Sequence, residues 1–245
     1  MLIKAALNGG RSRSEHPAIP ITPQELASSA KEAVAAGAGA IHFHVRGADE
    51  RESLDGDVVA LAVNAVKSAV PKAPVGVSTG AWILNNAKLR YDKISAWKTF
   101  PDFASINFKE DGAVALAQLL TSRGVPIEGG VADVEGTKIF LASGYADRCI
   151  RLLVEPLEQT FDAANQTLDA IVKLLDDANN KVPRVLHGLN ELAWPLVDEA
   201  AKRGYDTRVG FEDILTLPDG KSAPTNGALV AEAVRRMQSN RNRNE

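Results

Sequence analysis

The fold follows from the stretch Ala40-Ile41-His42-Phe43-His44-Val45-Arg46 and from the segments on either side of it. Apolar and polar residues alternate along this stretch, which is typical of a β-strand whose two faces meet different surroundings. An amphipathic helical pattern over Pro23–Ala36 precedes it and ends at a glycine-broken segment. A second helical pattern, over Asp57–Val70, comes after it. The stretch is therefore one strand in a helix–strand–helix alternation.

The same alternation runs along the whole chain. We expect strands at Leu2–Leu7, Ala40–Val45, Val75–Ser78, Phe103–Ile106, Pro126–Val131, Cys149–Val154, Val185–His187 and Thr207–Val209. We expect helices at Pro23–Ala36, Asp57–Val70, Val114–Ser122, Glu158–Asp177, Leu189–Arg203 and Gly227–Met237, with bounds left open after the third and fifth strands. This α/β pattern predicts a single-domain (β/α)8 TIM barrel. A doubly wound open sheet is the alternative.

Length and composition agree with one barrel domain. The chain has 245 residues; we assign residues 1–238 to a catalytic TIM-barrel domain and residues 239–245 to a polar C-terminal tail. A net charge of −3 gives no general attraction to nucleic acid or to an anionic membrane, and no apolar run is long enough to span one. The single cysteine, Cys149, excludes an internal disulfide and fits a cytoplasmic location.

His42 and His44 are the strongest candidates for a metal site. Residues two apart on a strand share a face, so both imidazoles point into the barrel. Inward-facing polar rings in a core of aliphatic side chains need partners, and a divalent cation supplies them. Two histidines and one carboxylate suit zinc, although they also suit other divalent metals. The alternative is a pair of core histidines that bond to neighbouring groups.

Other polar residues gather where strands end, which is the face on which barrel enzymes place their sites. His16 follows the first expected strand and His187 ends the seventh. The remaining strand ends carry Asn8, Ser78, Thr79, Gly80, Asn107, Glu128 and Glu155. Together these residues predict a polar pocket. Each of them alone also fits a helix cap, a turn or a solvated rim.

The eighth expected strand leaves the barrel through Arg208-Val209-Gly210-Phe211-Glu212-Asp213. Since the second and eighth strands are close neighbours in a closed barrel, Glu212 can meet His42 and His44 as a third metal ligand. Asp213 then lies beside a cation and Arg208, which suits a general base. An acidic pair at a strand end can also be the first turn of a helix.

These segments resemble the β-keto acid cleavage enzymes, whose founding member is the 3-keto-5-aminohexanoate cleavage enzyme. The similarity is carried by Pro20–Glu25, Ile41–Arg46, Ser78-Thr79-Gly80, Asn107, Arg208–Asp213 and the segment from Pro218-Asp219-Gly220 to Val230. It implies a TIM barrel, an oligomeric assembly and a zinc ion. It also implies conversion of a β-keto acid and acetyl-CoA into acetoacetate and a new acyl-CoA, an acyltransferase reaction that cleaves a C–C bond.

The resemblance also implies roles for individual residues. His42, His44 and Glu212 match the metal ligands, and Arg208 and Asp213 match the pair that deprotonates the β-keto acid. Ser78 and Asn107 match pocket residues that contact the substrate. To these we add Arg11, Asn8, Thr79, Gly80, Glu128 and His187 as candidate substrate-binding residues.

Two departures from the family pattern bear on substrate and cosubstrate. Arg11 stands where the founder has a glutamate that binds an amino group, so an anionic substrate tail is expected if Arg11 faces the pocket; a solvated Arg11 is the alternative. After the sixth strand, Val154-Glu155-Pro156 leads directly toward a helix instead of a glycine-rich loop, which puts acetyl-CoA binding in doubt.

The competing functions are a CoA-independent metal-dependent lyase or hydrolase of a small keto acid, and a non-catalytic barrel that binds a small acid. We expect Trp82, Trp97 and Trp194 to be packing residues and Cys149 to be an unreactive core residue.

Overall fold

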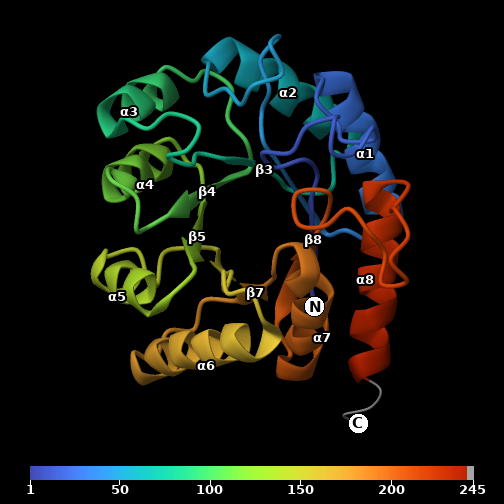
Figure 1. The fold of residues 1–245 in the computed structure, drawn as a ribbon. Coiled ribbons are helices and arrows are strands. Elements are labelled where there is room, and N and C mark those ends of the chain that lie inside the picture. Colours follow the sequence, from blue (N-terminus) through green and yellow to red (C-terminus); the bar gives the residue numbers. More distant parts are fainter. Residues whose placement is uncertain (242–245) are drawn as a thin grey trace.

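The computed structural model describes residues 1–241 and contains a closed barrel of eight parallel strands (Figure 1). Each strand pairs with its neighbours in chain order, and β8 closes the ring against β1. The strands are β1 Ile3–Ala6, β2 Ala40–Phe43, β3 Val75–Ser78, β4 Phe103–Asn107, β5 Ile127–Val131, β6 Arg151–Val154, β7 Arg184–Leu186 and β8 Asp206–Val209. The TIM barrel is confirmed, and the open sheet is excluded.

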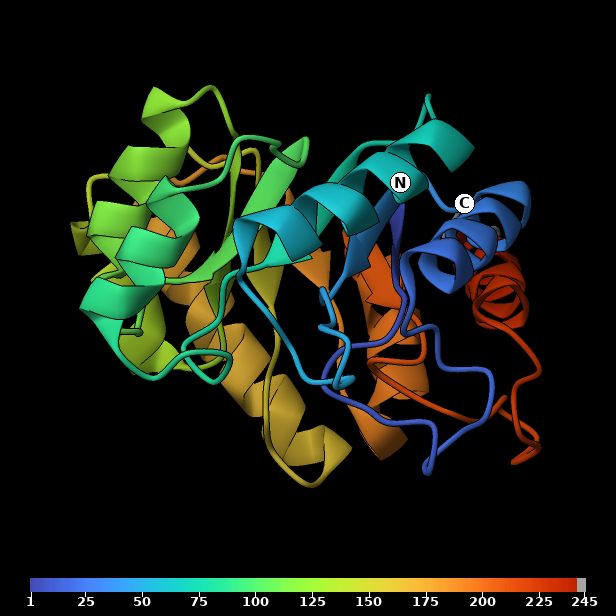
Figure 2. The ribbon, with the colours of Figure 1, turned by 90° about the horizontal axis from the view of Figure 1, so that it is seen from above.

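Helices surround the barrel, and Figure 2 shows them from a second direction. They are α1 Pro23–Ala35, α2 Gly56–Ala69, α3 Ala87–Ser95, α4 Ala113–Ser122, α5 Val134–Ala142, α6 Phe161–Asp177, α7 Ala193–Arg203 and α8 Asn226–Arg241, with a 3-10 turn, η1, at Asn190–Leu192. Over residues 1–241, none of these helices is long and apolar enough to cross a membrane.

The C-terminal end differs in part from the sequence prediction. Helix α8 continues to Arg241 and so includes the first residues of the segment 239–245 that we expected to be a polar tail. Residues 242–245 lie outside the described part of the chain.

Helix starts follow local chemistry. At α1, the Thr22 side chain accepts from the backbone N–H of Glu25, and the Glu25 carboxylate accepts from the backbone N–H of Thr22, so the expected capping box is present. The two helices whose bounds were open, α3 and α5, begin at capping side chains of Asn86 and Asp133. These caps satisfy backbone donors that a helix leaves unpaired at its start.

The strand alternation separates an apolar exterior from a polar interior. Ile41 and Phe43 are fully buried in the hydrophobic core between barrel and helices, whereas His42 belongs to the polar interior. His44 follows the last residue of β2, so its backbone leaves the ladder. The Asn8 side chain satisfies the backbone groups of His44 in place of a neighbouring strand. It accepts from the His44 N–H at 2.9 Å and donates to the His44 carbonyl at 2.9 Å.

Charged residues fill the barrel interior below the strand ends. Lys4 and Glu128 are fully buried and paired, and Arg151 lies 3.4 Å from the same carboxylate. The Ser105 hydroxyl donates to Glu128 at 2.7 Å. Burial lowers the pKa of Lys4 to about 8 in spite of the pairing. Glu128 is therefore paired with Lys4 and Arg151 inside the barrel. It does not line the pocket, where the sequence predicts it.

Candidate active site

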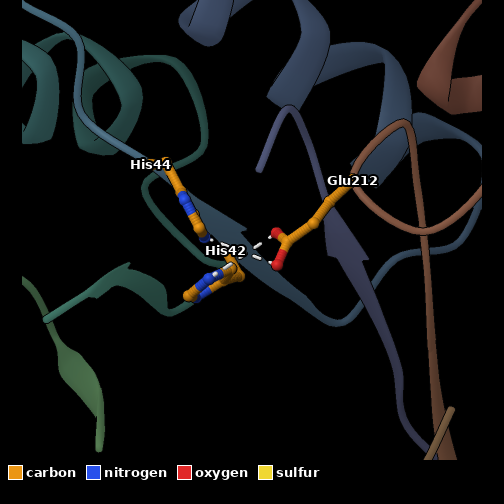
Figure 3. Close-up of side chains that lie close together, drawn as sticks. All are labelled: His42, His44 and Glu212. Atoms are coloured by element: carbon orange, nitrogen blue, oxygen red, sulfur yellow. Dashed lines mark ion pairs between the residues drawn. The ribbon is translucent and has the colours of Figure 1, made fainter. Parts of the chain in front are cut away.

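His42, His44 and Glu212 converge where β2 and β8 leave the barrel (Figure 3). The Nε2 atom of His42 is 3.7 Å from Oε2 of Glu212, and Nε2 of His44 is 3.4 Å from Oε1 of the same carboxylate. One ligand atom from each residue lies within 4.8 Å of the others, so the three can hold one metal ion. The inward direction predicted for the His-x-His pair is confirmed.

The donor set fits a divalent metal on two further grounds. Two imidazole nitrogens and a carboxylate are a usual set for zinc and neighbouring transition metals, and they leave coordination positions open for a substrate. In addition, Oε2 of Glu212 is buried without a hydrogen-bond partner among the described residues. A buried carboxylate oxygen in that state is costly unless a cation reaches it.

Glu52 supports His44 from behind and was not identified from the sequence. Its carboxylate contacts Nδ1 of His44, which leaves Nε2 directed at Glu212. Burial alone would lower the pKa of His44, but the Glu212 and Glu52 carboxylates outweigh it and raise the pKa to about 9. Such a carboxylate fixes the orientation of a ligating histidine and increases its basicity. Glu52 lies in an irregular loop, where residue spacing gives no signal.

Trp82 closes over the same histidine, and the prediction that it is a packing residue is wrong. Its indole is 55% exposed, stacks on the His44 ring at 5.9 Å and donates from Nε1 to Glu52 at 3.1 Å. Gly80 makes this possible, since a Cβ atom there would lie 2.2 Å from the indole. Trp97 and Trp194 are buried as predicted.

Arg208 and Asp213 form a buried ion pair next to the metal cluster. The guanidinium donates to both Asp213 oxygens from Nε, at 3.1 and 3.2 Å, and to Glu212 at 2.8 Å. Burial raises the pKa of the Asp213 carboxyl even against the attraction of Arg208. Gly210 shapes this turn, because a Cβ atom there would lie 2.0 Å from the Ala6 carbonyl oxygen. Asp213 itself is fully buried.

A pocket of about 630 Å³ opens above this cluster. Its polar lining includes His44, Asn107 and Glu212 among the predicted residues, together with Glu110 and Glu155. Ser78 and Thr79 are buried and are not among the residues that line the pocket. The Ser78 hydroxyl accepts from the Gly80 N–H at 3.3 Å, and the Thr79 hydroxyl donates to the Ser105 carbonyl at 2.8 Å.

Arg11 braces the loop that carries Glu212 and Asp213. Its guanidinium donates to the Glu212 carbonyl at 3.1 Å, to the Asn190 side chain at 2.6 Å and to Glu15 at 3.2 Å. It therefore matches neither alternative that the sequence left open, since it is neither directed at the pocket nor simply solvated. His16 likewise contacts loop groups rather than the cluster: it bonds to Ser222 at 2.8 Å and packs on Phe211.

Comparison with known proteins assigns the family. A sequence profile of the beta-keto acid cleavage enzymes matches residues 1–243. The chain belongs to this family. It is 26% identical to the 3-keto-5-aminohexanoate cleavage enzyme of Acetoanaerobium sticklandii, over 96% of this chain and 90% of that protein. A shorter similarity, 36% over 80 residues, covers 32% of this chain and 28% of a 3-oxoadipate:acetyl-CoA acetyltransferase from Cupriavidus necator.

Among solved structures, apo ObcA has the same fold, with a TM-score of 0.69 and 19% sequence identity. The similarity covers 91% of this chain but only 62% of ObcA, so the chain spans less than two thirds of that protein. The TIM barrel of this β-keto acid cleavage family member is thus shared with solved structures.

His187 is the most unusual residue of this family member. It is fully buried, and neither ring nitrogen has a hydrogen-bond partner among the described residues. Its Nε2 atom is 3.7 Å from Glu155 and its Nδ1 atom is 3.8 Å from Asp213. Burial, reinforced by Arg208, lowers the pKa of His187 well below its usual value, so the imidazole is neutral at pH 7. The histidine lies behind the pocket wall rather than on its surface.

Proposed function

We propose that the protein is a zinc-dependent acyltransferase that converts a β-keto acid and acetyl-CoA into acetoacetate and a new acyl-CoA. Its membership of the β-keto acid cleavage enzyme family supports this. The observation that carries the proposal is the buried Arg208–Asp213 pair next to a set of three side chains that could hold a metal, two of which, His44 and Glu212, line one pocket.

The side chains have complementary roles in this reaction. His42, His44 and Glu212 hold the metal, which when bound stabilises negative charge on the keto and carboxylate oxygens of the β-keto acid. Asp213 removes the proton between keto and carboxylate carbons, and Arg208 holds Asp213 in place and stabilises oxyanions. We assign Asn107, which lines the pocket, and the buried Ser78 to substrate positioning.

The enolate then attacks the thioester carbonyl of acetyl-CoA, and the CoA thiolate departs as the new C–C bond forms. The thiolate adds to the original keto carbon, the bond between that carbon and the α-carbon breaks, and acetoacetate and an acyl-CoA leave. The proton taken by Asp213 returns to the α-carbon, so protons and electrons balance without another reactant.

One observation favours acetyl-CoA as the cosubstrate, and another favours a reaction without it. The partial similarity to a 3-oxoadipate:acetyl-CoA acetyltransferase favours it. The short link from β6, which ends at Val154, to α6, which begins at Phe161, favours the second candidate, a CoA-independent lyase or hydrolase of a small keto acid. Glu155 in this link adds a group that can become negative and repel phosphates. A non-catalytic acid-binding barrel is disfavoured, since binding alone has little need of a buried base beside the metal.

Product analysis separates the candidates. The protein, loaded with zinc, is incubated with a panel of β-keto acids with and without acetyl-CoA, and products are identified by mass spectrometry. Acetoacetate and a new acyl-CoA that form only with acetyl-CoA, and only while Asp213 is present, support the transferase. Cleavage that proceeds equally without acetyl-CoA contradicts it and supports the lyase or hydrolase.

Metal identity, assembly and location are predictions of the same proposal. We expect near-stoichiometric zinc in the purified protein, with another divalent metal as the alternative, and loss of that metal in His42→Ala and Glu212→Ala. A homo-oligomer and a cytoplasmic location stay predictions from the sequence. The expected partners are small molecules, and neither nucleic acid nor a membrane is expected among them.

A further inference from the structure

Each of the two candidate metal-ligand histidines has one ring nitrogen that faces away from Glu212. In His44 this nitrogen, Nδ1, contacts Glu52. In His42, whose Nε2 atom is directed at Glu212 at 3.7 Å (Figure 3), Nδ1 lies 3.5 Å from the Ser105 hydroxyl oxygen. This contact is near the upper limit for a hydrogen bond. Its polarity depends on where the single hydrogen of the hydroxyl is directed.

The Ser105 hydrogen is committed to Glu128. The hydroxyl donates to Oε1 of that carboxylate at 2.7 Å. Glu128 is fully buried against two cations, Lys4 and Arg151, so its carboxylate accepts hydrogen bonds and has no hydrogen to give. A hydroxyl that has used its only hydrogen offers His42 a lone pair. The hydrogen between Ser105 and His42 must therefore come from the imidazole.

This requirement selects one tautomer of His42. An imidazole that carries its hydrogen on Nδ1 leaves the lone pair of Nε2 free, and Nε2 is the nitrogen directed at Glu212. The opposite tautomer would place two lone pairs against each other at Ser105. Oε2 of Glu212, which faces Nε2, has no hydrogen-bond partner among the described residues. Two buried acceptors that face each other in this way favour a cation between them.

The strand arrangement brings Ser105 to His42. The two residues belong to β4 and β2, which lie on either side of β3. The β3 residue that pairs with His42 is Gly76, which has no side chain. A Cβ atom there would lie 2.1 Å from the ring of Phe103, which is two residues before Ser105 and on the same face of β4. Inward side chains of β4 therefore reach past β3 toward β2.

We propose that Ser105 is a positioning residue of the metal site, which together with the buried Lys4–Glu128 pair keeps the His42 hydrogen on Nδ1 and directs Nε2 at the metal. The ion pair inside the barrel then has a function in the site, because it holds the Ser105 hydrogen away from His42. The inference rests on the proposed function for the metal that His42 binds.

Two substitutions at one position test the role of the hydroxyl. Zinc affinity is measured by competition with a chelator for wild type, for Ser105→Ala and for Ser105→Thr, which keeps a hydroxyl. Ser122→Ala is the matched control, because Ser122 is exposed on α4 and donates to the Leu119 carbonyl at 2.7 Å. Melting curves show whether each variant is folded.

The tautomer provides a second readout, which a merely structural role of Ser105 would not change. Long-range proton–nitrogen NMR of the zinc-free protein shows which ring nitrogen of His42 carries the hydrogen. The His42 signal is identified by its loss in His42→Gln.

We expect Ser105→Ala to bind zinc about tenfold more weakly than wild type, the lower end of the range for a group behind a metal ligand because the contact is long. Ser105→Thr and Ser122→Ala should stay close to wild type. The hydrogen should be on Nδ1 of His42 in wild type and should distribute over both nitrogens in Ser105→Ala.

Undiminished zinc affinity in Ser105→Ala, equal losses in the alanine and threonine variants, or a wild-type hydrogen on Nε2 overturns the positioning role. If the wild type binds no zinc, the proposed metal-dependent function fails, and NMR then decides the role of Ser105 alone. A hydrogen on Nδ1 that depends on the hydroxyl supports it, and one that does not overturns it. If Ser105→Ala does not fold, the wild-type tautomer and Ser105→Thr decide.

Discussion

Replacement of Glu52 by glutamine tests the architecture of the metal site without touching a ligand. The Glu52 carboxylate contacts Nδ1 of His44 and also accepts from the Trp82 indole. Glutamine keeps the size and one acceptor oxygen, so the variant removes mainly the negative charge. Carboxylate support behind a ligating histidine changes metal affinity by about tenfold to hundredfold, equivalent to about 1.4 to 2.7 kcal/mol.

Protons compete with zinc for His44, and Glu52→Gln weakens this competition while it weakens the support of the ligand. The two effects on zinc affinity are opposite, so the pH of the measurement must be chosen to separate them. In the metal-free protein the pKa of His44 is about 9, partly because of Glu52. At pH 7 a metal must displace that proton, which reduces apparent affinity by up to about a hundredfold. Glu52→Gln relieves part of this competition. The loss of affinity is therefore partly hidden near pH 7 and fully visible at about pH 9.

The assay is competition for zinc against a fluorescent chelator at both pH values. We expect Glu52→Gln to bind zinc about tenfold to hundredfold more weakly than wild type at the higher pH, with a smaller difference at the lower one. Glu135→Gln, on the exposed side of α5, serves as the matched control and keeps wild-type affinity. Equal affinity of Glu52→Gln and wild type at about pH 9 would refute the supporting role of Glu52.

Three further predictions concern the base, the proton and the turn. Asp213→Asn should lower kcat by about a hundredfold to ten-thousandfold while zinc content stays near that of wild type; retained turnover would exclude Asp213 as the base. Zinc affinity of the wild type should rise up to about tenfold per pH unit toward pH 9, because the metal binds only the unprotonated His44, whose pKa is about 9; a flat profile would contradict the raised pKa. Gly210→Ala should lower unfolding free energy by about 2 kcal/mol or more, since its Cβ would lie 2.0 Å from the Ala6 carbonyl; an unchanged denaturant midpoint would show that the turn can relax.

Much of the fold could be predicted from the sequence because its signals are local. The alternation around His42 and His44 placed both rings on the interior face, and the strand and helix periods together specified the barrel. The bounds of helix α3 do not follow from its sequence pattern, because the segment is rich in charged residues and the helix starts at the Asn86 cap. The short helix α5 likewise begins at a capping side chain, that of Asp133, rather than with a long apolar pattern.

Part of the candidate site could also be read from the chain. His42, His44 and Glu212 were expected to meet because β2 and β8 are both neighbours of β1 in a closed barrel, and the structure brings them together. Asp213 and Arg208 pair as expected, since the turn at Gly210 folds the loop back on the strand. Strand periodicity and barrel closure were sufficient for these contacts.

Only the tertiary structure decided what the loop and core side chains do. Arg11, expected near the substrate, donates to the Glu212 carbonyl in the loop that follows β8. Glu128 forms an ion pair with Lys4 inside the barrel. Glu52 and Trp82 reach His44 from irregular segments. In a strand, residue spacing fixes the direction of a side chain, whereas in a loop the direction depends on partners that are distant in the sequence.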